Sequence, residues 1–160
     1  MKIDKKLNEA MNKQIGEELK ASNGYASMAV YFDSLGLKRL AGMFFEQSEE
    51  EREHAFKFIH HLMDLEGEVV IPSVPAVPPS YDSVKHAFET ALSWEQEVTG
   101  MINHMMDLAI DLKDYPSQVF LNWFVTEQVE EEATMSQLLN LVNALGSSSI
   151  LNLEAHLPQE

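Results

Sequence analysis

The chain has 160 residues and no cysteine, and its 26 acidic side chains outnumber 11 basic ones to give a formal charge of −15. The missing cysteines exclude disulfides, thiolate zinc sites and iron–sulfur clusters. The negative charge disfavours nucleic acid and anionic membranes as partners, because both would repel the protein. It is equally compatible with attracting cations and with solubility alone.

Length and hydropathy predict one domain over residues 1–160. A chain of this size can bury a sizeable core. It contains no apolar run of about 18 residues, and the polar stretch 1–9 does not resemble a signal peptide. We therefore expect a cytoplasmic protein that does not cross a membrane.

Apolar residues recur at steps of three and four through four segments, which predicts four long helices. The segments span about 4–34, 37–65, 82–112 and 115–145, and a short fifth helix is expected within 147–157, over Ile150 to His156. Asp82 and Ser83 suit the N-cap of the third helix, and Pro116 suits the first turn of the fourth.

The connection between the second and third helices is long and rich in proline. It reads EGEVVIPSVPAVPPSY from Glu66 to Tyr81, so it should run extended. About 15 extended residues reach roughly 50 Å, whereas a helix of about 28 residues is roughly 42 Å long. The sequence therefore predicts an all-α four-helix bundle in which one long crossover makes the second and third helices parallel. Two hairpins joined by a flexible linker would each bury little surface.

Polar side chains interrupt the apolar face of each predicted helix near its middle. They are Glu18, then Glu51 with His54, then Glu95, and finally Gln128 with Glu131, and Gln14 and Gln47 lie on the same faces further from the midpoints. A helix midpoint has the same height in the bundle whichever way the helix points. We therefore expect these side chains to converge at one level inside the bundle.

Burying four carboxylates together is unfavourable, because each isolated ion costs at least several kcal/mol. No Lys or Arg lies on these faces near the helix midpoints. Two divalent cations would balance four glutamates, with His54 as a neutral nitrogen ligand. Protonation is the alternative, although protonating several carboxylates at neutral pH is harder. Oxygen-rich ligands with one imidazole suit iron(II), manganese or zinc.

Several motifs together resemble the non-haem ferritins of prokaryotes, over residues 4–145. They are Glu18-x6-Tyr25, Glu51-x-x-His54, Glu95, and the string EQVEEE at 127–132 after FLNWF at 120–124. The resemblance implies a di-iron centre with these residues as ligands: Glu18, Glu51 and His54 on the first iron with Gln128 beside it, and Glu51, Glu95 and Glu131 on the second.

The resemblance also implies a third, weaker iron site at Glu50, Glu127 and Glu130, shared with Glu131. A solvated acidic face is the alternative for these residues. Family members place a tyrosine beside the di-iron centre, where it supplies an electron, and Tyr25 matches that position. Its alternative is a core aromatic whose hydroxyl bonds a carboxylate.

Other aromatic residues and histidines are expected to have no part in the centre. Trp94 and Trp123 should pack against the core. The remaining histidines have no converging partners and are expected at the surface; they are His60, His61, His86, His104 and His156.

Differences between this sequence and related families narrow the type of ferritin that it resembles. Haem-binding bacterioferritins have methionine where this chain has Arg52, and a second E-x-x-H where it has Gln128-x-x-Glu131, so no haem is expected. The proline-rich crossover argues against mini-ferritins, and the missing cysteines argue against rubrerythrins.

The resemblance implies a ferroxidase that oxidises Fe(II) with dioxygen or hydrogen peroxide. It would store ferric mineral inside a homo-oligomeric, 24-subunit cage. The alternatives are a bundle that binds divalent cations passively and a di-iron oxidase acting on an organic substrate.

Overall fold

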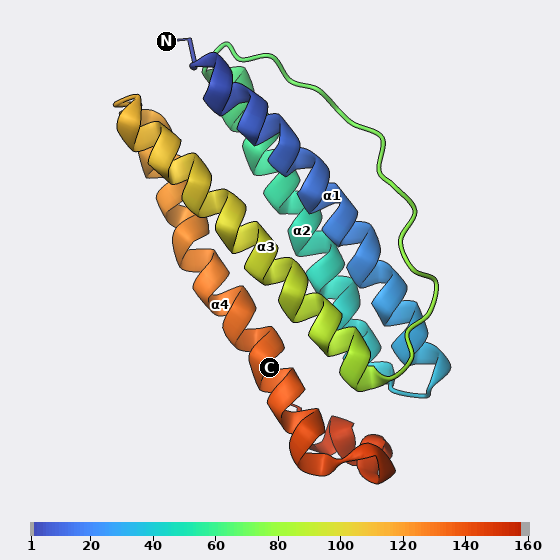
Figure 1. Cartoon of the computed structure of the whole chain (residues 1–160). Helices are drawn as coiled ribbons and strands as arrows, with labels where there is room; N and C mark the ends of the chain where they lie inside the picture. The colour runs from blue at the N-terminus through green and yellow to red at the C-terminus, as the bar shows by residue number, and fades with distance from the viewer. Residues whose placement is uncertain (1, 158–160) are drawn as a thin grey trace.

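Four long helices form a bundle, and a short fifth helix lies at one end of it (Figure 1). The computed structural model describes residues 2–157, except for the side chains of 147–149. The elements are α1 (Lys5–Ser34), α2 (Lys38–Asp64), α3 (Val84–Asp111), α4 (Tyr115–Leu145) and the 3₁₀ helix η1 (Ser147–His156). The all-α prediction is confirmed. Within 2–157, none of the helices combines the length and the apolar character that crossing a membrane requires.

Short polar side chains begin three of the helices, as helix N-termini require. Asp4 accepts a hydrogen bond from the backbone N–H of Lys6 at the start of α1. Ser83 does the same at α3, as predicted, and Asp114 at α4, where proline also occupies the first turn. By contrast, Leu37 precedes α2 and makes no side-chain cap.

The crossover runs along α1 from one end of the bundle to the other (Figure 1), so α2 and α3 are parallel as predicted. Two asparagines of α1 bind its backbone. The amides of Asn8 and Asn12 donate to the carbonyl of Glu68, at 3.0 and 2.7 Å. Their oxygens accept from the N–H groups of Glu68 and Val70, at 2.9 and 2.7 Å. These amides therefore satisfy backbone groups that an extended segment alone leaves open.

The fifth helix supplies the cap that α2 lacks. Glu154 Oε1 accepts from the backbone N–H of Arg39 at 2.6 Å and of Leu40 at 3.0 Å. Its negative charge also suits the positive end of the α2 dipole. Leu153 and Leu157 are buried in the bundle core. The fifth helix was expected over Ile150 to His156, and the structure extends it by three residues at its start.

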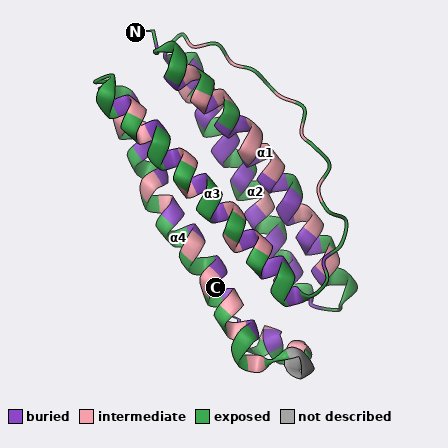
Figure 2. Cartoon of the chain, in the orientation of Figure 1, coloured by how far each residue is buried: buried purple, intermediate pink, exposed green. Residues whose placement is uncertain are grey.

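The core consists of two apolar halves, and buried residues line the inward faces of the helices (Figure 2). One half contains Phe32 and Phe44, whose ring centroids lie 4.8 Å apart. The other contains Phe58 and Phe124, 4.4 Å apart. Most of the buried polar residues lie between the halves. The apolar packing on both sides therefore fixes where those polar side chains lie.

Replacing Gly24 with alanine should destabilise the protein. An added Cβ at Gly24 would lie 2.5 Å from the Trp94 ring, which itself packs edge-on against Tyr25. At Gly100 of α3, an added Cβ meets nothing within 4 Å, so Gly100→Ala should stabilise the helix by about 0.5–1 kcal/mol. Calorimetric melting temperatures of the two variants check this. A melting temperature of Gly24→Ala equal to that of Gly100→Ala would contradict the clash.

Candidate metal centre

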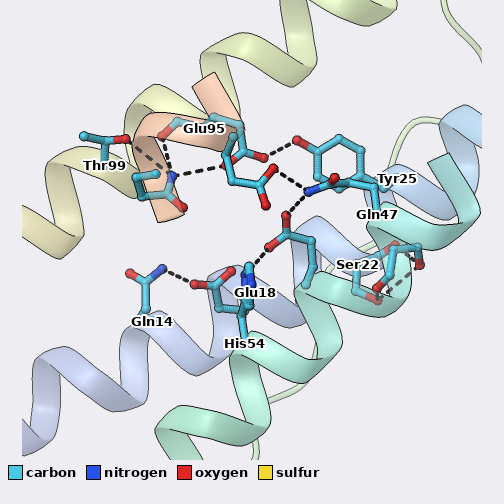
Figure 3. A network of polar contacts seen from close by, with 12 residues as sticks. Gln14, Glu18, Ser22, Tyr25, Gln47, His54, Glu95 and Thr99 are labelled. Carbon is cyan, nitrogen blue, oxygen red and sulfur yellow. Dashed lines mark hydrogen bonds and ion pairs between the residues drawn. The ribbon is translucent and has the colours of Figure 1, made fainter. Parts of the chain in front are cut away.

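Eight buried polar side chains from all four long helices lie in one layer between the apolar halves. Figure 3 shows polar contacts in this layer, with Gln14, Glu18, Gln47, His54 and Glu95 labelled. They are Gln14, Glu18, Gln47, Glu51, His54, Glu95, Gln128 and Glu131. The four glutamates are between 1% and 5% exposed. The structure thus brings together, from separate parts of the chain, the residues that interrupt the apolar faces.

The ligand atoms of Glu18, Glu51 and His54 all lie within 4.8 Å of one another. We call these three residues the first group. Glu51 and His54 share one face of α2 because three residues separate them. His54 Nδ1 lies 3.3 Å from Glu51 Oε2. One cation could therefore bind two carboxylates and an imidazole nitrogen here.

A second group consists of Glu51, Glu95 and Glu131, again with ligand atoms within 4.8 Å of one another. These carboxylates come from α2, α3 and α4. Glu51 belongs to both groups, and its two oxygens could each serve one cation. The arrangement therefore has room for two cations that share Glu51 as a bridge.

The acidic residues expected at a weaker third site lie less close together than the residues of the first two groups. Glu127 is half-exposed and lies with His54 and Glu131 in a third group of possible ligands. Glu50 and Glu130 are exposed. Burial raises the pKa of Glu50, His54 lowers it, and the charges of Glu51 and Glu127 raise it further. Glu130 belongs to none of the three groups among residues 2–157.

Two glutamines hold carboxylates of the first two groups. Gln14 Nε2 donates to Glu18 Oε1 at 2.8 Å. Gln47 Nε2 donates both to Glu51 Oε1 at 2.8 Å and to Glu131 Oε2 at 2.7 Å. The sequence places both glutamines on the inward faces but gives them no role. The only local signal is their position, four residues before a buried glutamate.

Glu95 is held from two sides. The Tyr25 hydroxyl donates to Oε1, and Gln128 Nε2 donates to Oε2 at 3.2 Å. Gln128 also reaches the Thr99 hydroxyl, which in turn donates to Glu132 at 2.6 Å. Thr99 and Glu132 did not stand out in the sequence, because neither interrupts an apolar face.

The carboxylates interact strongly with one another. Burial raises the pKa of Glu95 to about 7 and that of Glu131 to about 9, and the charge of Glu51 adds to both shifts. Burial and the charge of Glu51 also raise the pKa of Glu18 well above its usual range. Burial would raise the pKa of Glu51 as well, but hydrogen bonding, foremost with His54, lowers it instead. Within the layer, the pKa of Glu51 is thus lowered while the pKa values of the other three glutamates are raised.

These residues fit divalent cations. Apart from the contact between Glu18 and Glu51, the hydrogen-bond partners of the four carboxylates are amides, a phenol and an imidazole, which bring no permanent positive charge. Within residues 2–157, no amide, hydroxyl or backbone donor reaches the buried Glu18 Oε2. An open carboxylate oxygen facing an imidazole and further carboxylates is a favourable donor set for a metal ion.

Two aromatic rings flank the layer. Trp94 is half-buried and lies edge-on to Tyr25, with ring centroids 5.8 Å apart. Trp123 lies edge-on to His54 at 5.4 Å, although 41% of its surface is exposed. Both tryptophans therefore pack against residues of the layer.

One histidine departs from the expectation that the remaining histidines lie at the surface. His61 is half-buried, stacks on Phe120 with ring centroids 4.0 Å apart, and lies 3.1 Å from the Ser117 hydroxyl. Burial lowers its pKa. The prediction was wrong because the approach of α4 to α2 covers this side chain. The other four histidines are exposed.

Comparisons with known proteins identify the family. The family model for the ferritin-like domain matches residues 8–145. The ferritin BfrB of Mycobacterium tuberculosis is 36% identical over 143 residues, which cover 89% of this chain and 79% of that relative. The bacterial non-heme ferritin of Staphylococcus saprophyticus is 34% identical over 147 residues, which cover 92% of this chain and 88% of that relative.

Solved ferritin structures are also similar to this chain. An open-pore ferritin from the hyperthermophilic archaeon Archaeoglobus fulgidus superposes with a TM-score of 0.92 at 35% identity. The superposition covers 98% of this chain and 99% of that one. A closed form of the same archaeal ferritin, engineered by site-directed mutagenesis, superposes with a TM-score of 0.90. With the family model and these relatives covering nearly the whole bundle, the chain belongs to the ferritin family.

Proposed function

We propose that the chain is an iron-storage ferritin subunit that oxidises Fe(II) at a di-iron ferroxidase centre. The observation that carries this proposal is the pair of three-residue groups sharing Glu51 in a buried layer. The first iron would bind Glu18, Glu51 and His54, with Gln128 nearby, and the second would bind Glu51, Glu95 and Glu131. Iron is the substrate here, so the ions enter, react and leave.

The proposed reaction takes one electron from each of two Fe(II) ions. With dioxygen and two protons, the products are two Fe(III) and hydrogen peroxide. With hydrogen peroxide and two protons, they are two Fe(III) and two water molecules. Carboxylate oxygens are hard donors, so they stabilise Fe(III) more than Fe(II) and favour oxidation. Holding both ions beside Glu51 allows the oxidant to take both electrons at one place.

Tyr25 is proposed to supply a further electron near the centre. Its hydroxyl donates to Glu95, and its ring packs between Phe44 and Trp94. Burial raises the pKa of Tyr25, and the charge of Glu95 adds to the shift, so the phenol stays protonated. A neutral phenol bonded to a carboxylate can give one electron to the oxidant and its proton to Glu95, which leaves a tyrosyl radical.

Glu50, Glu127 and Glu130 are proposed to receive iron that leaves the centre. Support comes from Glu127, whose carboxylate lies close to His54 and Glu131. Glu131 belongs to the second and third groups alike, so it could hand an ion from one to the other. Greater exposure of Glu50 and Glu130 suits a weaker site that releases its ion.

The chain is further proposed to form a cytoplasmic, haem-free homo-oligomer, a 24-subunit cage that holds the mineral. Membership of the ferritin family supports a cage. The Staphylococcus relative is named a non-heme ferritin, which supports the absence of haem. The charge of −15 is compatible with drawing cations toward the protein.

Replacing Glu51 with glutamine should slow Fe(II) oxidation at least tenfold, because it removes the charge that both iron positions share. Fe(II) is added without oxygen, an oxygen pulse follows, and the early rise in ferric absorbance is recorded. Glu49→Gln, at an exposed position of the same helix, is the matched control and should keep the wild-type rate. A passive cation binder would give no fast rise even in the wild type. An unchanged rate in Glu51→Gln would refute the assignment of Glu51.

The metal-free protein should lose stability as the pH rises from about 5 to 9. The pKa of Glu131 rises from 4.5 to about 9 on folding, and that of Glu95 to about 7. The folded chain therefore binds protons that the unfolded chain releases, so the free energy of unfolding falls across this window. Glu131→Gln should flatten the fall and be more stable than the wild type near pH 8. Urea unfolding in the presence of a chelator measures both, with Glu49→Gln as control, and equal slopes would contradict the shift.

Size-exclusion chromatography should show an assembly far larger than the 18.1 kDa monomer. Light scattering on the eluted peak gives the number of subunits, and a cage predicts 24. Elution as a monomer or dimer, in iron-free and iron-loaded samples alike, would contradict the cage while leaving the iron chemistry to be judged by oxidation rates.

A further inference from the structure

We infer that Gln14 and Gln47 each position the ligands of a different metal ion: Gln14 acts on the ion of the first group, and Gln47 acts mainly on the ion of the second. This inference rests on the proposed function, because it assigns roles within the same centre. Neither glutamine belongs to a ligand group, so both act through the carboxylates that they hold.

The two glutamines occupy matching positions on neighbouring helices. Each lies four residues before a glutamate ligand of its own helix, α1 or α2, and each donates Nε2–H to Oε1 of that glutamate at 2.8 Å. Both side chains are buried (Figure 3). In a helix, residues four apart lie on the same face, so this bond forms without moving the backbone.

The two glutamines contact carboxylates that belong to different ions. Gln14 bonds to Glu18, which belongs only to the first group. Gln47 bonds to Glu51 and also to Glu131, which the second group contains and the first does not. Gln47 therefore holds two of the three ligands of the second ion and joins α2 to α4.

An amide suits this task better than a charged group. It donates hydrogen bonds without adding charge, so it orders a carboxylate and leaves the negative charge for the metal ion. Each held carboxylate also keeps a second oxygen for the ion. In Glu18, Oε1 is bound by Gln14, while no amide, hydroxyl or backbone donor of residues 2–157 reaches Oε2.

The orientation of the Gln14 amide supports its role. Its own oxygen, Oε1, is buried without a hydrogen-bond partner, so no second group fixes how the amide is turned. When Glu18 is ionised, as it is when it binds a metal ion, the reverse orientation would place this oxygen against Glu18 Oε1, and two acceptors repel. Glu18 is therefore the partner that orients Gln14, and the bond between them restrains Glu18 in turn.

Methionine replaces each glutamine at nearly the same length but donates no hydrogen bond, so Gln14→Met and Gln47→Met test the inference. Anaerobic titration with Co(II), followed by calorimetry, measures the affinity of each ion in the assembled protein. The binding step that disappears from the titration of His54→Ala is assigned to the first ion. The step that disappears from the titration of Glu95→Ala is assigned to the second ion. Loss of a group that orients a ligand weakens metal binding by about 10- to 100-fold.

Gln14→Met should weaken the first step by about tenfold or more and leave the second within about twofold, since Glu18 belongs to the first group alone. Gln47→Met should weaken the second step more than the first. Ser22→Ala is the matched control: Ser22 is also buried between α1 and α2, but it bonds to Ser48 and not to a ligand. It should leave both steps unchanged. Where a methionine variant does not fold, the leucine variant takes its place.

The inference fails if both variants weaken both steps equally, which would indicate general loosening of the bundle, or if neither variant changes either step. The reverse pattern would also overturn it. These results leave the proposed function intact, because the wild type would still bind two ions. A wild type without two binding steps would instead refute the di-iron centre itself.

Discussion

The burial of four carboxylates in one layer is the constraint on which the rest of the structure depends. Each ion loses several kcal/mol of hydration free energy, and their mutual repulsion adds to that loss. The two apolar halves of the core, on either side of the layer, supply the compensating stabilisation. Because those halves hold the helices in place, the carboxylates cannot separate, and their charge has to be neutralised by protons or by cations.

The helices, their order and the crossover could be predicted from the sequence because their signals are local. Periodic apolar residues located each long helix to within one or two residues at most ends. Four prolines excluded helix from the crossover, and its length was enough for it to span the bundle and make α2 and α3 parallel. The cap on α2 could not be predicted in this way. Glu154 lies 115 residues from Arg39 in the chain, and only the folded bundle brings them together.

The level of the buried carboxylates was also predictable, since helix midpoints coincide in height. Which side chains hold them was not. Gln47 contacts Glu51 on its own helix and Glu131 on another, and the second contact depends on how α2 and α4 are rotated. The same rotation half-buries His61 against Phe120, where the sequence predicted a surface histidine. Periodicity defines the inward face of a helix, but it does not say which neighbours that face meets.

The contact between Glu154 and the start of α2 has a consequence for the order of folding. During synthesis, residues 38–64 leave the ribosome well before residue 154, so the first hairpin emerges while the N–H groups of Arg39 and Leu40 still face water. The first turn of α2 therefore gains this cap only once the final helix docks. A chain that stopped before residue 154 would lack the cap, and that turn would fray more readily.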